Sequence, residues 1–199
     1  MSAKSPDHEN AHSRASRGRE PTPWQTLSQE RVFAAPPFLE VWRQTVMTGS
    51  GKAISDFYKV KMRPYVVCVP FLSDGRVLMV RQFKQGPQKV CLTFPGGFID
   101  PRESPEEACR RELLEETGAD ANELTHLGRF VDNGNQEGCT GDYFCAHGVQ
   151  MLFEPNPDPH EEIVSVALSP DDVTEALRRG DLGIVHHAAA WGLAQLFGR

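Results

Sequence analysis

The sequence predicts an α/β fold in which a small β-strand region precedes one larger domain. Three observations indicate this: short apolar runs separated by turn residues, a well-capped helix in the middle of the chain, and two further helices at its end. The chain has 199 residues, of which 39% are hydrophobic, so it is long enough for one compact core. We divide it into a tail (1–30), a β region (31–62) and a main domain (63–199).

Residues 1–30 are expected to form a disordered tail. They are rich in Ser, Arg, His, Glu and Pro and show no apolar periodicity, so they cannot bury enough surface to offset the entropy lost on ordering. After them, residues 40–47 and 53–60 are predicted as two strands around a Gly-rich turn at 49–52.

The strands of the main domain are predicted from their apolar residues. Residues 65–71 are nearly all apolar, as in a strand that is covered on both faces. A turn at 73–75 leads into a second apolar strand at 76–82, so these two strands are predicted to form a hairpin. Further strands are expected later in the chain, at 126–132, 141–148 and 163–168.

Two helices are predicted at the C-terminal end. Ser169 is a favourable N-cap, Pro170 suits the first helical position, and Gly180 ends the first helix. The second is an apolar helix at 184–196. Two adjacent histidines in it resemble a metal-binding pair, but neighbouring residues of a helix point about 100° apart. We therefore interpret them as core or surface side chains: His186 and His187.

Charge and composition argue against several classes of function. The net charge of −6 and the pI near 5.6 disfavour general binding to nucleic acid or to anionic membranes. No apolar stretch approaches the ~18–20 residues of a membrane span, and the N-terminus does not resemble a signal peptide. The five cysteines show no CxxC pairing and are interpreted as reduced thiols of a cytoplasmic protein: Cys68, Cys91, Cys109, Cys139 and Cys145.

The most informative segment is a predicted helix at 105–117. Ser104 and Glu107 have the spacing of a capping box, and Gly118 supplies the C-terminal stop. Like charges on one face of a helix give no stability by themselves. Such a face is explained either as a solvated surface balanced by neighbouring arginines or as a set of oxygen ligands for Mg²⁺. Three glutamates share one face here: Glu112, Glu115 and Glu116.

The whole pattern around this helix decides between the two explanations. The helix and the residues just before it follow a predicted strand and a Gly-rich loop. The pattern resembles the Nudix box, because every specified position matches and only the last apolar residue is smaller than usual: Gly97, Glu103, Arg111-Glu112-Leu113, Glu115-Glu116, Gly118 and Ala119.

This resemblance implies an α/β/α sandwich with a mixed β-sheet, and it implies roles for residues in and near the box. Glu115 and Glu116 would be the principal ligands of Mg²⁺, with Mn²⁺ as an alternative metal. Glu112 would be a further ligand or a water-orienting carboxylate, and the carbonyl of Gly96 would be available to a metal. Arg111 would hold the carboxylates in place through ion pairs.

The implied reaction is hydrolysis of the pyrophosphate bond in a nucleoside diphosphate that is linked to another group. Metal ions would neutralise the phosphate charge and lower the pKa of a bound water, and a carboxylate would take the proton of that water. Glu103 would support Arg111 from the segment before the helix. The alternative in a different class is a Nudix fold that binds nucleotides without cleaving them, but an intact box favours the enzyme.

Beyond the box, residues 35–198 resemble the ADP-ribose pyrophosphatase branch of the family. That branch has N-terminal strands before the catalytic sheet, an Arg-Gln-aromatic-basic stretch and two C-terminal helices. Its members are commonly dimers whose N-terminal strands help to build the partner's site. The resemblance therefore implies a homodimer that acts on ADP-ribose or a related nucleotide sugar. Candidate substrate-binding residues include two aromatics, for which core packing is the alternative role: Arg81, Lys84, Phe83 and Trp42.

Two segments depart from that branch. The branch usually carries a proline in the loop after the box, whereas residues 132–137 of this chain contain none. Its distal catalytic glutamate falls in an acidic loop, here 158–162, where Glu161 is the first candidate for the general base and Glu137 is the rival. A solvated loop acid is the alternative for both. Hydrolysis of GDP-sugars, dinucleoside polyphosphates, NADH or nucleoside triphosphates stays open. An isoprenoid diphosphate isomerase is disfavoured, because its expected cysteine has no counterpart.

Overall fold

The computed structural model describes residues 20–156 and 162–197. Its strands follow the path β1-β2-β3-β9-β4-β5-β10, with β6 paired to β5 and with β7 and β8 paired to β9. β9 runs parallel to both β3 and β4, whereas the other pairings are antiparallel, so the predicted mixed sheet is confirmed. The elements are β1 (Gln25–Ala35), β2 (Leu39–Met47), β3 (Ala53–Met62), β4 (Tyr65–Leu72), β5 (Val77–Lys84), β6 (Lys89–Thr93), α1 (Pro105–Thr117), β7 (Ala119–Asp120), β8 (Glu123–Asn133), β9 (Glu137–Met151), β10 (Ile163–Leu168), α2 (Pro170–Arg179) and α3 (Val185–Phe197).

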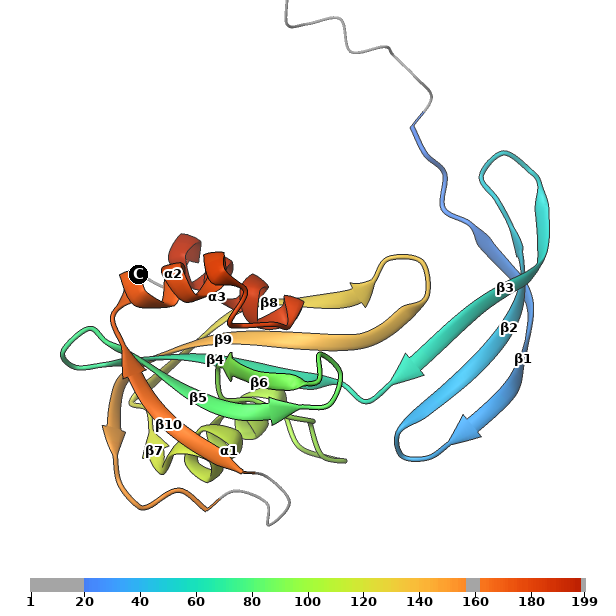
Figure 1. The fold of residues 1–199 in the computed structure, drawn as a ribbon. Helices are drawn as coiled ribbons and strands as arrows, with labels where there is room; N and C mark the ends of the chain where they lie inside the picture. Colours follow the sequence, from blue (N-terminus) through green and yellow to red (C-terminus); the bar gives the residue numbers. More distant parts are fainter. Residues whose placement is uncertain (1–19, 157–161, 198–199) are drawn as a thin grey trace, which may run out of the picture.

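Helices cover both sides of the sheet, with α1 on one side and α2 and α3 on the other (Figure 1). Each side has its own core. Leu113 of α1 packs in a cluster that includes Val66 of β4, whereas Trp191 of α3 packs in a second cluster that includes Val67. Neighbouring residues of β4 thus alternate between the two cores. This alternation explains the continuous apolar run and confirms that the strand is covered on both faces.

The hairpin predicted for the first two strands of the main domain is present, but it is short. β4 and β5 share a single pair, Phe71 with Val77, next to the turn. β4 instead runs along β9, and β5 lies between β6 and β10. The turn reverses the chain as expected, but the two strands separate after it because β9 and β10 offer them longer hydrogen-bonded partners.

β1, β2 and β3 form an antiparallel sheet that extends away from the main body (Figure 1). The prediction of a disordered tail was wrong for residues 25–30, since β1 begins at Gln25. This polar segment is ordered by backbone pairing with β2 and by an ion pair between Glu30 and Arg43, rather than by burial of apolar side chains. Residues 1–19 lie outside the described part of the chain.

The helix predicted at 105–117 is confirmed as α1, together with both of its ends. Ser104 Oγ accepts a hydrogen bond from the amide of Glu107 at 3.2 Å, and Glu107 Oε2 accepts one from the amide of Ser104 at 2.8 Å. Gly118 ends the helix with a φ of 71°, which favours glycine. A Cβ at this position would also overlap the carbonyl oxygen of Phe153.

The C-terminal helices and the state of the cysteines also agree with expectation. Ser169 caps α2 and Gly180 ends it, and α3 follows close to its predicted range. All five cysteines are free thiols and buried. Across residues 20–156 and 162–197, no helix has the length and apolar character needed to cross a membrane.

Candidate active site

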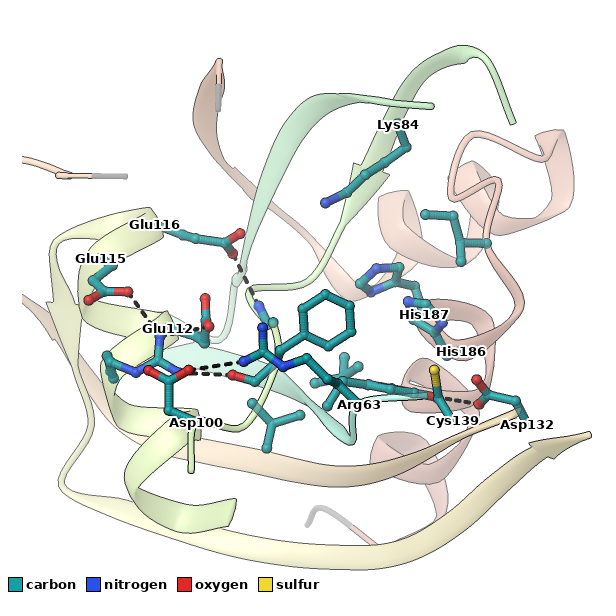
Figure 2. Close-up of a pocket in the computed structure, with 18 residues that line it drawn as sticks. Arg63, Lys84, Asp100, Glu112, Glu115, Glu116, Asp132, Cys139, His186 and His187 are labelled. Atoms are coloured by element: carbon teal, nitrogen blue, oxygen red, sulfur yellow. Dashed lines mark hydrogen bonds and ion pairs between the residues drawn. The ribbon is translucent and has the colours of Figure 1, made fainter. Parts of the chain in front are cut away.

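A pocket of about 640 Å³ lies between α1, the loop before it, β4 and the start of α3 (Figure 2). Acidic side chains of α1 form one wall. Residues from the ends of β8 and β9 and from α3 form the opposite wall, and a lysine of β5 extends between the two. The polar and charged side chains that line the pocket include Arg63, Tyr65, Lys84, Asp100, Arg111, Glu112, Glu115, Glu116, Asp132, Cys139, His186 and His187.

Two glycines bring the backbone of the loop before α1 against the carboxylates. A Cβ on Gly96 would overlap the carbonyl oxygen of Val66 in β4, and a Cβ on Gly97 would lie 2.6 Å from Glu112 Cδ. The amide of Gly96 donates a hydrogen bond to Glu116 Oε2 at 3.1 Å. Gly96 therefore lies beside the carboxylate cluster, and the use of its carbonyl by a metal stays a prediction.

Arg111 connects the members of the cluster. Its Nε and Nη2 donate to the two oxygens of Glu103 at 2.8 and 3.0 Å, and its Nη1 donates to Glu112 at 2.7 Å and to Glu115 at 3.1 Å. Hydrogen bonds to these carboxylates, that of Glu103 first, raise the pKa of Arg111, and the same arginine lowers the pKa of Glu103. The ion pairs expected for Arg111 are present.

The three glutamates that face the pocket differ in burial. Glu116 is only 2% exposed, the side chain of Glu112 is 13% exposed and that of Glu115 is 46% exposed. Carboxylate oxygens at one end of a pocket fit a divalent cation such as Mg²⁺, which fills its remaining positions with water and phosphate oxygens. No three His, Cys, Asp or Glu side chains already form a metal cage within the described residues. A cation held by Glu112 and Glu115 would share their oxygens with Arg111.

The opposite wall combines residues that are far apart in the sequence. The Tyr65 hydroxyl donates to Asp132 Oδ1 at 2.7 Å, and the ring of Tyr65 lies 4.8 Å from that of His186 between centroids. Burial lowers the pKa of both His186 and His187, which favours their neutral forms. Burial first, and then Asp132, raises the pKa of the Cys139 thiol to about 11. Sequence reasoning missed this wall, because it interpreted the two histidines as core or surface side chains rather than as residues of a pocket.

One of the four candidate substrate-binding residues, Lys84, lines the pocket. Arg81 and Phe83 lie on the same strand, β5, but side chains alternate along a strand, so both point away from the face of Lys84 and are exposed. Trp42 lies in β2 of the N-terminal sheet, where its Nε1 donates to Glu40 Oε2 at 3.1 Å. Contact of substrate with these three residues stays a prediction.

Of the two candidates for the general base, only Glu137 belongs to the described part of the chain, and it is not among the residues that line the pocket. Glu137 begins β9 and forms an ion pair with Lys59 of β3, at the junction with the N-terminal sheet. Glu161 lies outside the described residues. The catalytic role of either glutamate stays a prediction.

An α/β/α sandwich whose capped helix presents carboxylates to a pocket is the arrangement that the Nudix box implies. Residues 61–188 match the family model of the NUDIX domain, and the chain belongs to this family. It is a Nudix pyrophosphohydrolase, and members of this family generally use divalent metal cations.

Comparison with known proteins confirms the resemblance to the ADP-ribose pyrophosphatase branch. An ADP-ribose pyrophosphatase of Bacillus subtilis (strain 168) is 28% identical over 142 residues, which cover 71% of this chain and 75% of that protein. The ADP compounds hydrolase NudE of Escherichia coli (strain K12) is 42% identical over 71 residues, which cover 34% of this chain and 38% of that protein. A crystal structure of an ADP compounds hydrolase has a TM-score of 0.75 and 23% identity, covers 90% of this chain and 96% of its own, and shares the fold.

Proposed function

We propose that this enzyme uses Mg²⁺ to cleave the pyrophosphate bond of ADP-ribose or a related nucleotide sugar, giving a nucleoside monophosphate and a sugar phosphate. The observation that carries this proposal is the position of Glu112, Glu115 and Glu116 at one end of a pocket of about 640 Å³, which is large enough for a diphosphate and an attached group. The names of two relatives support substrates that contain ADP.

Some residues of the box would bind the metal, and others would position those ligands. Bound Mg²⁺ would neutralise phosphate charge and lower the pKa of a water molecule. Glu115 and Glu116 would bind the metal, and Glu112 would bind it too or orient the water. Arg111 sets the positions of Glu112 and Glu115 through its hydrogen bonds, and Glu103 fixes Arg111 from the loop before α1.

The test of this proposal is a hydrolysis screen over ADP-ribose, other ADP- and GDP-sugars, NADH, dinucleoside polyphosphates and nucleoside triphosphates. We expect Mg²⁺-dependent turnover of ADP-ribose that stops when EDTA removes the metal and returns when Mg²⁺ is restored. Glu116→Gln should lower kcat/KM by about 100- to 1000-fold and leave the circular dichroism spectrum unchanged. Glu106→Gln is the matched control on the same helix, since Glu106 does not line the pocket.

Two outcomes of the screen would contradict the proposal. Full activity of Glu116→Gln would remove this residue from the metal site. Binding of a nucleotide without turnover of any diphosphate, with Mg²⁺ or Mn²⁺, would instead identify a nucleotide sensor, which is the alternative in a different class.

The group that takes the proton from the attacking water is a separate proposal. Glu161 is our first candidate and Glu137 is its rival. Replacing a general base with glutamine lowers kcat and removes the acidic limb of the pH–rate profile, while metal binding persists. We expect this result for Glu161→Gln in stopped assays across pH. The same result for Glu137→Gln, with an unchanged profile for Glu161→Gln, would transfer the role to the rival.

We also propose a cytoplasmic homodimer in which the N-terminal sheet contributes to the partner's site. Five buried free thiols support a reducing compartment. In such a dimer, Trp42 and Phe83 would be candidates to stack on a base, and Arg81 would be a candidate to contact a phosphate. These three residues do not line the pocket of their own chain.

A further inference from the structure

The hydrogen bond of His187 determines which of its ring nitrogens is a donor. The residue is 4% exposed, and its Nδ1 lies 3.3 Å from the backbone nitrogen of Phe94. A backbone N–H can only donate, so Nδ1 accepts, and the neutral ring then carries its proton on Nε2. Burial lowers the pKa of His187 well below its usual range and keeps the ring neutral. Because the ring lines the pocket, Nε2 offers a fixed N–H donor there.

Asp132 supplies a fixed acceptor on the same wall. Its Oδ1 accepts a hydrogen bond from the Tyr65 hydroxyl at 2.7 Å. The Tyr143 hydroxyl lies 2.9 Å from that of Tyr65 and donates to it, because the single hydrogen of Tyr65 is already directed at the carboxylate. This chain of hydrogen bonds, which starts in the buried core, holds the Asp132 carboxylate in position on the pocket wall, where the Cys139 thiol also forms a hydrogen bond with it. A thiol is a weak donor, so the carboxylate can still accept a hydrogen bond from a ligand.

A fixed donor beside a fixed acceptor suits a ligand that carries hydroxyl groups, because each hydroxyl can both donate and accept. A nucleobase would need a free aromatic face. On this wall Tyr65 does not offer one, since it is buried and packs on His186. The exposed aromatic of the pocket, Phe98, lies on the loop before α1, where the Arg63 guanidinium lies 4.8 Å over its ring. Figure 2 shows Lys84 extending between this wall and the carboxylates of α1, where its ammonium group is suited to a phosphate oxygen.

We propose that His187 and Asp132 form the subsite that recognises the sugar on the distal phosphate of the substrate, and that Lys84 binds the phosphate next to that sugar. This inference rests on the proposed function, because it takes the diphosphate to be held at the carboxylate end of the pocket. The sugar then lies against the opposite wall. His187 and Asp132 determine which group the enzyme binds on the distal phosphate, and neither takes part in bond cleavage.

Two substitutions at His187 separate its contact with substrate from its contact with the protein. His187→Asn keeps an acceptor near the position of Nδ1 for the Phe94 amide and removes the donor that faces the pocket. His187→Gln places an amide N–H near the position of Nε2 and gives up the acceptor. Asp132→Asn replaces one carboxylate oxygen with an NH2 donor. Depending on how the amide is turned, this donor faces the pocket or takes the place of the oxygen that accepts from Tyr65. The matched control is His147→Asn, since His147 stacks on Phe71 and does not line the pocket.

The experiment measures kcat/KM for ADP-ribose and for the methyl ester of ADP, which has the same diphosphate and no distal sugar. We expect His187→Asn and Asp132→Asn each to lower kcat/KM for ADP-ribose by about tenfold and to leave the value for the methyl ester near that of the wild type. His187→Gln should recover most of the loss in spite of a lower Tm. His147→Asn should leave both values unchanged.

Calorimetric binding of ribose 5-phosphate, with inorganic phosphate as the sugar-free probe, tests the subsite without turnover. We expect His187→Asn to weaken only the binding of the sugar phosphate, by about tenfold. If this occurs while no diphosphate is hydrolysed, the proposed function fails and the subsite stands. The subsite is refuted, and the proposed function stands, if the wild type and His187→Asn hydrolyse ADP-ribose with equal kcat/KM. The same conclusion follows if His187→Asn lowers kcat/KM by the same factor for ADP-ribose and for the methyl ester of ADP. If the wild-type protein binds neither ADP-ribose nor ribose 5-phosphate, both the subsite and the proposed function are refuted.

Discussion

Gly97 positions a carboxylate because it has no side chain. A Cβ at this position would lie 2.6 Å from Glu112 Cδ, so Gly97→Ala should push that carboxylate away from the pocket end. A displacement of this size near reacting atoms can cost about 100-fold in rate, and we expect kcat/KM to fall by about this factor. Gly86→Ala is the control, since a Cβ there meets nothing within 4 Å. An unchanged kcat/KM for Gly97→Ala would show that the position of Glu112 does not matter.

The pair formed by Glu103 and Arg111 predicts how stability depends on pH. Glu103 has a pKa below its ordinary value of 4.5, because Arg111 donates hydrogen bonds to its carboxylate. Ionisation is thus favoured in the folded state. The contribution of the pair to stability is complete above pH 4.5 and is lost as pH falls through the lowered folded-state pKa. Urea unfolding of the wild type and Glu103→Gln should give free energies that differ at neutral pH and converge in acid.

The control for that measurement is Glu123→Gln, which removes a carboxylate from an exposed position at the start of β8. Its difference from the wild type should be small and vary little with pH, because surface charges contribute little. If the difference between Glu103→Gln and the wild type does not shrink between neutral pH and about pH 3, the ion pair is not the cause of the stabilisation.

The carboxylate wall could be predicted from the sequence, and the opposite wall could not. Glu112 and Glu116 lie on one helix, whose geometry fixes the relative positions of side chains as soon as its ends are recognised. Tyr65, Asp132 and His187 come from two strands and another helix, and only the sheet pairing and helix packing of the fold bring them to one pocket. No local pattern encodes such an arrangement.

The N-cap of α1 gives a prediction about the helix that presents the carboxylates. Ser104 bonds the amide of Glu107, and loss of such a cap costs about 1 kcal/mol of stability. Ser104→Ala should therefore lower the free energy of unfolding by about this amount in urea titrations. Activity well below the melting temperature should change by less than about twofold, since Arg111 fixes the carboxylates two turns later. Ser169→Ala in α2 is the matched control for stability, and a large fall in activity for Ser104→Ala would show that the first turn positions the site.

Elements with strong local signals were predicted well, and those formed by pairing alone were not. The bounds of α1 follow from its capping box and its terminal glycine. The first part of β1, residues 25–30, is mostly polar and shows no apolar alternation, so nothing in its sequence distinguishes it from a tail until β2 pairs with it. β6 was missed because it is short, and the partners of β4 and β5 depend on β9 and β10. Partner choice is a property of distant segments, which a local turn does not encode.

The N-terminal sheet differs from the main body in how its apolar residues are covered. The body buries two clusters, one on each side of its sheet. β1 lies at the end of the strand path and pairs only with β2 within the described residues, and an open edge of this kind favours pairing with another chain. Large apolar side chains are exposed throughout the N-terminal segment, at Trp24, Leu27, Val32, Phe33, Phe38, Tyr58 and Met62. This surface supports the proposed homodimer.

Light scattering coupled to size-exclusion chromatography tests that dimer. We expect the wild-type chain to elute with twice its monomer mass. A stable interface buries at least about 1,000 Å², and the exposed apolar residues of the N-terminal sheet are the surface that we expect to supply it. Phe33→Asp places a charge on the exposed surface of β1 and should shift the mass toward the monomer, because an unpaired charge is costly to bury. The control is Phe197→Asp, which adds the same charge at the exposed C-terminal end of α3 and should leave the dimer intact.

If the N-terminal sheet also completes the partner's site, monomeric Phe33→Asp should show a raised KM for ADP-ribose. A wild-type monomer, or a Phe33→Asp dimer, would place the interface elsewhere or remove it.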